Sequence, residues 1–289
     1  MAIIGLVLRP GVEEARGLAC EISQWAKKNN HTLLVEEHSA ELLECQSQSV
    51  TSEHLVREAD PIVTLGGDGT LIGIGRHVTT PAPLMVGVNF GTLGFLTEIT
   101  PSEVFNALES VIDGTAQVGE RIMLRATVTR DGKEVFSCQA VNDAVIQKGS
   151  RDPLLDLDLH VQGENVTRLR ADGVILATPT GSTAYSLAAG GSIVHPSLEV
   201  VLVTPVCAHA LTSRPFLLPL SFQVDVHIPE YRGEVFLSVD GQESCKLTPG
   251  DTVSIRRSEH VVRFVLSESK SYFNILRRKL NWGIANQGE

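Results

Sequence analysis

The run Gly66–Thr70 (GGDGT) has residue types that suit phosphate chemistry. It follows the short apolar run Pro61–Leu65, which has the pattern of a buried strand. Glycines let backbone N–H groups approach a phosphate closely, and a helix after such a loop offers its N-terminus to the same anion. Asp68, at the centre of the run, is able to accept a proton. Alone, the pattern also fits a tight strand-to-helix turn in which Asp68 or Thr70 caps the helix.

A second glycine-rich stretch, NFGTLGFL at residues 89–96, follows the apolar run Leu84–Val88. Phe90 and Phe95 would be core residues in most proteins. An aromatic ring beside a glycine loop at the edge of a sheet can also form the wall of a base or ribose site. We predict that Phe95 is such a wall and takes no part in the chemistry.

Two polar stretches in the second half of the chain are further candidates. Arg170 precedes Ala171-Asp172-Gly173, and the stretch continues to the hydroxyl-rich TPTGSTAY at 178–185. Hydroxyls and free amides at such a turn suit ribose and phosphate, but Thr180, Ser182 or Thr183 could equally cap a helix. The pair Asn142-Asp143 interrupts an apolar strand pattern, and its ordinary interpretation is a turn or bulge.

Several other kinds of site are absent from the sequence. No GxxxxGK[ST] motif occurs, since Gly132-Lys133 precedes Glu134, and no GxGxxG follows the first strand. The five cysteines are scattered and never form a CxxC pair, so neither a disulfide framework nor a zinc site is indicated. The nine histidines do not form a ligand spacing either. We therefore expect no metal held by protein ligands, and any ATP site must be built without a P-loop.

The elements that carry these stretches divide the chain into parts. Up to about residue 118, short apolar runs alternate with helical patterns, as in βα units around a parallel sheet. Expected strands are 3–8, 32–35, 61–65 and 84–88, and expected helices are 12–28 and 101–112. From 119 to 266 the pattern has period two with frequent turns, so this domain should be mainly β, with a helical interruption near 182–189. Residues 267–289 return to helical spacing.

Composition restricts the partners. The chain has 289 residues, 43% of them hydrophobic, and a formal net charge of −10. Nucleic acid and anionic membranes call for a basic face, so neither is expected as a partner. No apolar stretch is long enough for a transmembrane helix and no signal-peptide pattern precedes the first strand, so we expect a cytoplasmic protein.

The motifs together resemble the bacterial ATP-dependent NAD kinases. GGDGT, NFGTLGFL, Asn142-Asp143, ADG and TPTGSTAYSLAAGG occur in the same order and spacing. Further similarity lies in HALTSRP at 209–215, VDGQ at 239–242 and the terminal SYFNILRRKLNWG. The resemblance implies an α/β N-terminal domain with a parallel sheet, a mainly β C-terminal domain that binds NAD, and a C-terminal segment that returns to the α/β domain.

The resemblance also implies roles for residues. Asp68 would be the proton acceptor when the terminal phosphoryl group of ATP moves to the 2′-hydroxyl of the adenosine ribose of NAD, giving NADP. Mg²⁺ or another divalent cation would accompany ATP, and the protein would be a homodimer or homotetramer. Arg170 would influence the choice between ATP and polyphosphate. The nucleotide-binding residues would be Gly67, Gly69, Thr70, Phe95, Asn142, Asp143, Arg170, Asp172, Thr180, Ser182, Thr183, Ala184, Tyr185 and Gln242.

One departure and two alternatives accompany this interpretation. Many members of the family have Asn-Glu where this chain has Asn142-Asp143, so the carboxylate is kept on a shorter side chain. Diacylglycerol-type lipid kinases share GGDGT, but a lipid kinase should present a basic or apolar docking surface. A module that binds NAD without turnover would lack the proton acceptor, and Asp68 is present.

Overall fold

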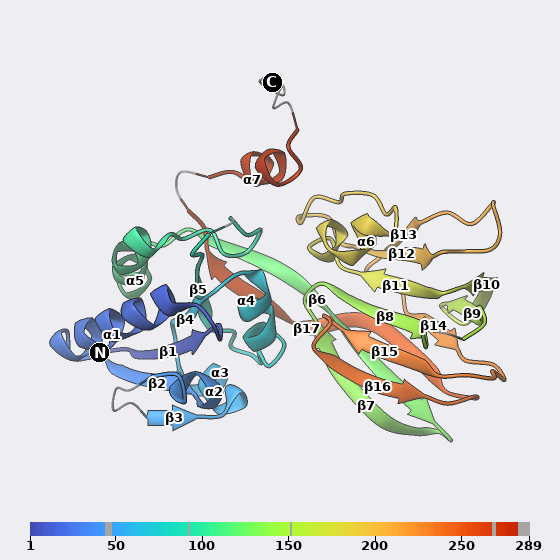
Figure 1. The fold of residues 1–289 in the computed structure, drawn as a ribbon, viewed down its shortest axis with the longest axis horizontal. Coiled ribbons are helices and arrows are strands. Elements are labelled where there is room, and N and C mark those ends of the chain that lie inside the picture. The colour runs from blue at the N-terminus through green and yellow to red at the C-terminus, as the bar shows by residue number, and fades with distance from the viewer. Residues whose placement is uncertain (44–47, 92, 151, 268–269, 283–289) are drawn as a thin grey trace. The chain divides into compact units, whose positions relative to one another are not determined.

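The computed structural model describes residues 1–43, 48–91, 93–150, 152–267 and 270–282. The chain forms two compact units (Figure 1): unit 1 comprises Met1–Glu120 and Val262–Glu289, and unit 2 comprises Arg121–Val261. It leaves unit 1 in strand β6 (Val118–Arg130) and returns in strand β17 (Thr252–Val265). Cys45, Thr92, and residues 268–269 and 283–289 of the expected C-terminal segment lie outside the described residues.

Unit 1 is built on a parallel sheet in the order β5-β4-β1-β2-β3. The end of β17 lies parallel to β5, with Arg263 opposite Leu84. Strands covered on both faces need apolar side chains throughout, as the runs IIGLVL and LMVGV provide. The strands are β1 (Ile3–Leu8), β2 (Thr32–Glu36), β3 (Gln48–Val50), β4 (Ile62–Leu65) and β5 (Leu84–Val88).

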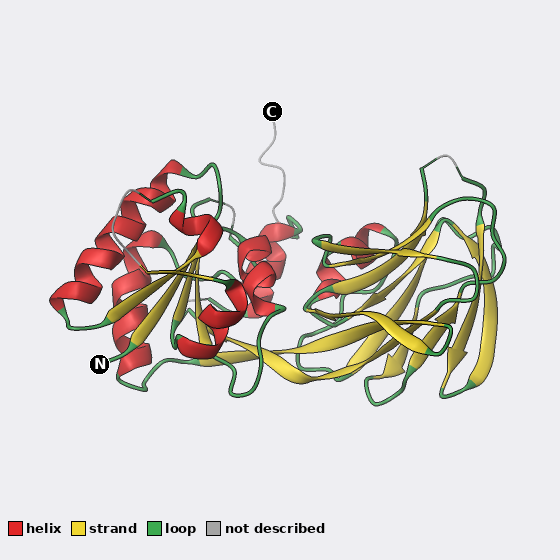
Figure 2. Cartoon of the chain, turned by 90° about the horizontal axis from the view of Figure 1, so that it is seen from below, coloured by secondary structure: helices red, strands yellow, loops and turns green. Residues whose placement is uncertain are grey.

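Helices cover both faces of this sheet (Figure 2). On one face, α1 (Glu13–Lys28) and α5 (Val104–Ile112) share a core with the alternating β1 side chains Ile4, Leu6 and Leu8. The other face carries α3 (Ser52–Glu58) and α4 (Asp68–Gly75). The remaining helices of the unit are the short α2 (Glu37–Ala40), the 3₁₀ turn η1 (Pro101–Glu103) and α7 (Tyr272–Lys279).

Unit 2 contains two antiparallel layers. One is a six-stranded sheet in the order β13-β12-β11-β8-β15-β16, and the other includes β10-β9-β14 with β17, together with the β6–β7 hairpin. Both layers contribute buried side chains to one core, among them Leu157 of β9 and Leu176 of β11. Buried and partly buried side chains alternate along β9, as expected of a strand with one covered face. Between β11 and β12, η2 (Gly181–Thr183) and α6 (Tyr185–Ala188) form the helical interruption.

The strands of unit 2 not yet bounded are β7 (Lys133–Ala140), β8 (Asp143–Lys148), β9 (Leu155–Val161), β10 (Glu164–Ala171), β11 (Gly173–Ala177), β12 (Val200–Val206), β13 (Phe216–Pro219), β14 (Val224–His227), β15 (Val235–Val239) and β16 (Glu243–Leu247).

The fold class predicted from sequence is confirmed, with differences in detail. The runs DTVSIRR and VVRFVL have the pattern of two short strands with a polar stretch between them, but they belong to the single strand β17 of 14 residues. The polar stretch between them contains no glycine or proline to end the strand. Residues 101–112 begin with a 3₁₀ turn before α5, and Ile112 is exposed. Among the described residues, no helix is long and apolar enough to cross a membrane.

Candidate active site

The turn between β4 and α4 is fixed by its first glycine. Gly66 leaves the strand, Gly67 is the N-cap of α4 in an extended conformation, and α4 begins at Asp68. A Cβ atom on Gly66 would lie 2.3 Å from Thr70 Oγ1, a distance that no real contact shows. Only glycine therefore lets the chain turn so sharply at the carboxyl end of β4, where parallel sheets place their ligands.

Asp68 does not cap its helix. The N-cap position of α4 is occupied by Gly67, so the interpretation of Asp68 or Thr70 as the N-cap is wrong. The carboxylate instead binds residues 95–97, which follow β5. Its Oδ1 accepts the backbone N–H of Leu96 at 3.0 Å, and the N–H and hydroxyl of Thr97 at 3.0 and 2.9 Å. Oδ2 accepts the N–H of Phe95 at 2.7 Å.

The two carboxylate oxygens of Asp68 therefore differ in what they can still accept. Among the described residues, Oδ1 has three donors and Oδ2 has a single hydrogen-bond donor, and each oxygen offers about two lone-pair sites. The side chain is 23% exposed, and Lys279 Nζ lies 4.0 Å from Oδ2. The ring of Phe95 stands beside the same ammonium, with its centroid 5.0 Å from Nζ. Oδ2 is thus the oxygen available to a further hydroxyl.

A pocket of about 750 Å³ in unit 1 opens over this loop. Gly67, Asp68, Gly69 and Thr70 line it together with Asn89 and Gly94. Its lining also holds positive charge, on Arg9, Arg76 and Lys279. In a chain with a net charge of −10, this local group of cations suits a ligand that carries several negative charges.

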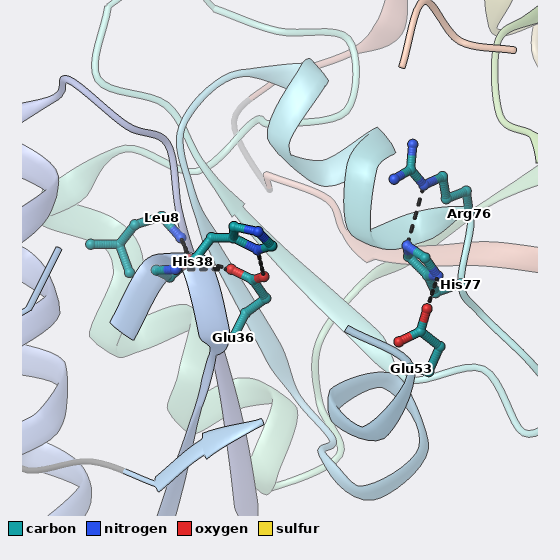
Figure 3. A network of polar contacts seen from close by, with 7 residues as sticks. Leu8, Glu36, His38, Glu53, Arg76 and His77 are labelled. Atoms are coloured by element: carbon teal, nitrogen blue, oxygen red, sulfur yellow. Dashed lines mark hydrogen bonds and ion pairs between the residues drawn. The ribbon is translucent and has the colours of Figure 1, made fainter. Parts of the chain in front are cut away.

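Two hydrogen-bonded clusters contribute Glu36, His38, Arg76 and His77 to the lining of this pocket (Figure 3). In one, the carboxylate of Glu36 binds His38 Nδ1 at 2.8 Å and both the N–H and hydroxyl of Ser39. Burial works to raise the pKa of Glu36, but the hydrogen bonds from His38 and Ser39 outweigh it and lower the pKa. The hydrogen bond to Glu36 raises the pKa of His38.

In the second cluster, His77 links two other charged residues. Its Nδ1 lies 3.2 Å from Glu53 Oε1, and its Nε2 accepts from Arg76 Nε at 3.2 Å. An imidazole that accepts at Nε2 carries its proton on Nδ1, where it can donate to Glu53. These contacts link Arg76, at the C-terminal end of α4, through His77 to Glu53 of α3.

A second pocket, of about 350 Å³, lies within unit 2. Asn142, Asp143, Ala184 and Tyr185, four of the residues predicted to bind nucleotide, line it together. Tyr185 is 43% exposed, so its ring face is open to a ligand. Gly181 allows this arrangement, because a Cβ there would lie 2.1 Å from the carbonyl oxygen of Asn142.

Two aspartates in this pocket have different environments. Asp143 is 5% exposed, and burial, with a smaller contribution from the charge of Asp240, raises its pKa to about 7. Asp240 instead accepts the backbone N–H groups of Val141, Asn142 and Asp143 at 2.8 to 2.9 Å. Asp240 therefore holds the start of β8 in place, while the Asp143 carboxyl changes protonation near neutral pH.

The other predicted residues do not line either of these two pockets. Ser182 is fully buried and binds backbone groups of Pro179 and Val194. Thr183 donates to the carbonyl of Thr180, whose own hydroxyl is buried and has no partner in the part of the chain that the structure describes. Asp172 lies 3.5 Å from Lys148 Nζ. Arg170 and Gln242 are exposed, on β10 and in the turn after β15 respectively.

Sequence reasoning missed some residues that line the pockets. Asp240 lines the pocket of unit 2. It belongs to the stretch VDGQ, which is similar to the family, but the resemblance did not imply a role for this aspartate. Lys279 is far from Asp68 in sequence, and only the helical spacing of its segment was visible. Arg9, at the end of β1, could have been noticed as a cation at the carboxyl end of a strand.

Known proteins resemble this chain along almost all of its length. The ATP-NAD kinase N-terminal domain matches residues 4–116, and the ATP-NAD kinase C-terminal domain matches residues 141–267. The NAD kinase of Geobacter metallireducens is 45% identical over 93% of this chain and 94% of its own length. That of Syntrophobacter fumaroxidans is 37% identical over 99% of both chains.

Two solved structures have the same fold. Yeast NADH kinase complexed with NADH superposes with a TM-score of 0.90 at 29% identity, covering 99% of this chain and 89% of that one. An NAD kinase from Archaeoglobus fulgidus in complex with ATP gives a TM-score of 0.75 at 25% identity, covering 96% of this chain and 98% of that one.

Proposed function

This chain belongs to the ATP-NAD kinase family, and we propose that its reaction transfers the γ-phosphoryl group of ATP to the 2′-hydroxyl of the adenosine ribose of NAD. The products are NADP and ADP. The observation that carries the proposal is the arrangement of Asp68, whose Oδ2 keeps an accepting position at the rim of a pocket large enough for a nucleotide.

In this mechanism Asp68 Oδ2 accepts the proton of the 2′-hydroxyl as that oxygen bonds to the γ-phosphorus. The bond between the γ-phosphorus and the β,γ-bridging oxygen breaks, and ADP leaves with the electron pair. The three donors on Oδ1 fix the orientation of the carboxylate, so that Oδ2 faces the same direction in every turnover. Phosphoryl transfer depends mainly on such positioning and on charge stabilisation.

The donor phosphates fit the 750 Å³ pocket of unit 1. Its glycine loop lets backbone approach them, the N-terminus of α4 carries partial positive charge, and Arg9, Arg76 and Lys279 add full charges. The pocket is also a fit for a divalent cation that arrives with ATP, because Mg²⁺ takes one or two carboxylates beside substrate phosphates. Asp68 and Glu36 are carboxylates of the lining, and Glu36 is already engaged by His38 and Ser39. The cation would neutralise phosphate charge.

For the acceptor we propose the pocket of unit 2, where Asn142 and Asp143 would hydrogen-bond NAD and Tyr185 would pack on it. Phe95 would form a wall beside Asp68. Roles for Asp172, Thr180, Ser182, Thr183, Gln242 and Arg170 stay predictions, as do a homodimeric or homotetrameric assembly and a cytoplasmic location. Arg170 is expected to favour ATP over polyphosphate.

One assay tests the proposal directly. Purified protein with ATP and Mg²⁺ is offered NAD, NADH, diacylglycerol and a 2′-deoxyadenosine analogue of NAD in parallel. We expect NAD to yield NADP, and we expect no product from the lipid or the analogue. Phosphorylation of the lipid without NADP formation would favour the lipid kinase alternative, and phosphorylation of the analogue would place the reaction at another hydroxyl.

A further inference from the structure

The C-terminal helix α7 is attached to unit 1 through Glu98. The buried carboxylate of Glu98 accepts the N–H of Ser267 at 2.9 Å, and its backbone carbonyl accepts from Lys270 Nζ at 2.5 Å. Lys270 also lies 3.7 Å from Glu103. Glu98 directly follows Thr97, which binds Asp68. The segment that leads into α7 is therefore fixed to the same loop that orients the Asp68 carboxylate.

Along α7, one face packs inward and carries Lys279 toward that loop. Ile275 and Leu276 are 1% and 3% exposed, and the ring of Tyr272 lies 6.1 Å from the ring of Phe95. At the end of the helix, Lys279 Nζ is 4.0 Å from Asp68 Oδ2 and 5.0 Å from the centroid of Phe95. Its side chain is 28% exposed and lines the pocket over GGDGT.

The ordinary interpretation of Lys279 is a solvated cation that favours the C-terminal end of its helix. The last turn of α7 does contain three basic residues. Arg277 donates to Asn274 within the same helix, at 3.0 Å. Lys279 instead approaches an aspartate whose other oxygen already has three donors. The general preference of cations for the C-terminal ends of helices does not explain why Lys279 lies beside Oδ2 and over the Phe95 ring.

We propose that Lys279 is a positioning residue for phosphoryl transfer, acting through Asp68. This inference rests on the function proposed above. The ammonium holds the direction of Oδ2, and the Phe95 ring keeps the ammonium in place. Loop 95–97 donates to both oxygens, through Leu96 and Thr97 to Oδ1 and through Phe95 to Oδ2. The C-terminal helix adds a second, charged contact on Oδ2, so this oxygen is oriented by two separate parts of the chain.

The experiment compares three variants of the full-length protein. Lys279→Met keeps the length of the side chain and removes its charge, Lys279→Arg keeps the charge, and Arg278→Met removes the neighbouring exposed charge of the same turn. Steady-state kcat and the KM values for ATP and NAD are measured for each, together with thermal stability.

We expect Lys279→Met to lower kcat by on the order of 10²-fold with little change in the KM for NAD, because a displaced catalytic group slows the step rather than binding. The KM for ATP should rise as well, since Lys279 is one of the three cations that line the pocket proposed for the donor phosphates. Lys279→Arg should recover most of that loss, and Arg278→Met should behave as wild type. All three should unfold at similar temperatures.

The outcomes separate this inference from the function on which it rests. If the wild-type protein forms no NADP, the proposed function fails. If it forms NADP and Lys279→Met has the same kcat as Arg278→Met, only the role of Lys279 is overturned. A loss in Lys279→Met that Lys279→Arg does not recover, with a lowered unfolding temperature in both, would make the residue structural.

Discussion

Asp68 Oδ1 accepts two hydrogen bonds from Thr97, one from its backbone N–H at 3.0 Å and one from its hydroxyl at 2.9 Å. The residues lie 29 positions apart, in the segments that follow the neighbouring strands β4 and β5. Through this double contact the carboxylate, which belongs to α4, also fixes the position of the loop after β5. A change at Asp68 must therefore be tested for its effect on the loop as well as on the chemistry.

Asp68→Asn should lower kcat by on the order of 10² to 10⁴, the usual contribution of a general base. The amide cannot accept a proton, and it replaces one acceptor oxygen by an NH₂ group. Because the interaction is made at the moment of transfer, kcat and kcat/KM should fall together. Steady-state kinetics beside thermal unfolding measures both effects.

Thr97→Val is the control for that variant. It removes the hydroxyl that binds Oδ1 but leaves the carboxylate and the backbone donors in place. We expect a loss of stability of about 1 kcal/mol and only a modest fall in kcat. A folded Asp68→Asn enzyme that turns over as fast as Thr97→Val would contradict the role of Asp68 as proton acceptor.

Gly94→Ala should disable the enzyme, although Gly94 carries no functional group. A Cβ atom at this position would lie 2.0 Å from Asp68 Oδ1 and 2.2 Å from Thr97 Oγ1, so the carboxylate or the loop must move. Gly91→Ala in the same loop is the matched control, because its Cβ would meet nothing within 4 Å. We expect kcat to fall in the first variant and to be retained in the second. Equal activity in both would show that the carboxylate tolerates displacement.

The stability of the protein should depend on pH through Asp143. Burial and the charge of Asp240 raise its pKa from 3.8 to about 7. A raised pKa means that the folded state binds the proton more tightly than the unfolded state. The stability that this carboxyl contributes is therefore present in full below about pH 4 and is lost as the pH rises through about 7.

Asp143→Asn removes this titration, so the stabilities of wild type and variant, measured by urea unfolding without ligand, should diverge between about pH 4 and pH 7 and run parallel at higher pH. The wild type should lose stability relative to Asp143→Asn as the pH rises. Asp113→Asn, on the exposed end of α5, provides the control and should follow the wild type. Parallel pH profiles for wild type and Asp143→Asn would show that the carboxyl is not held in a buried environment.

Asp143→Ala should raise the KM for NAD and largely spare kcat, since a contact made equally in the bound substrate and the transition state affects binding alone. Asp143→Glu restores a carboxylate on a longer side chain, and it should keep the KM closer to that of the wild type. Initial rates at varied NAD and saturating ATP make the comparison. A large fall in kcat for Asp143→Ala, with unchanged KM, would place Asp143 in the chemical step.

Much of unit 1 could be predicted because its signals are local. The strand Ile3–Leu8 follows from an apolar run, and this prediction is confirmed. The spacing of Ala15, Leu18, Ile22 and Trp25 predicts a helix with one face on the sheet; the first three side chains are buried in α1, and Trp25 is partly buried. The unbroken strand β17 could not be predicted in the same way. Its polar stretch Arg256–His260 resembles a loop, but it continues the strand between pairing with β14 and pairing with β5.

The same distinction applies to the candidate site. GGDGT and Asn142-Asp143 can be recognised from the sequence by their residue types and positions. GGDGT follows an apolar strand pattern, and Asn142-Asp143 interrupts one. The hydrogen-bond partners of Asp68 could not be predicted in this way, because residues 95–97 are distant in sequence and belong to the loop after the next strand, β5. Lys279 and Asp240 reach their neighbours over about 200 and 100 positions respectively, as the contacts with Asp68 and Val141 require. Periodicity within a short window carries no information on such pairs.

The crossing of the chain through β6 and β17 has a consequence for biosynthesis. Unit 2, residues 121–261, is interrupted by no part of unit 1, so its whole sequence has been translated before residue 262 is added. Unit 1 differs, because the end of β17 that pairs with β5 and the helix that carries Lys279 are made only after unit 2. During synthesis, unit 1 therefore begins before unit 2 but is completed after it. The edge of β5 stays unpaired by β17 until unit 2 has been translated.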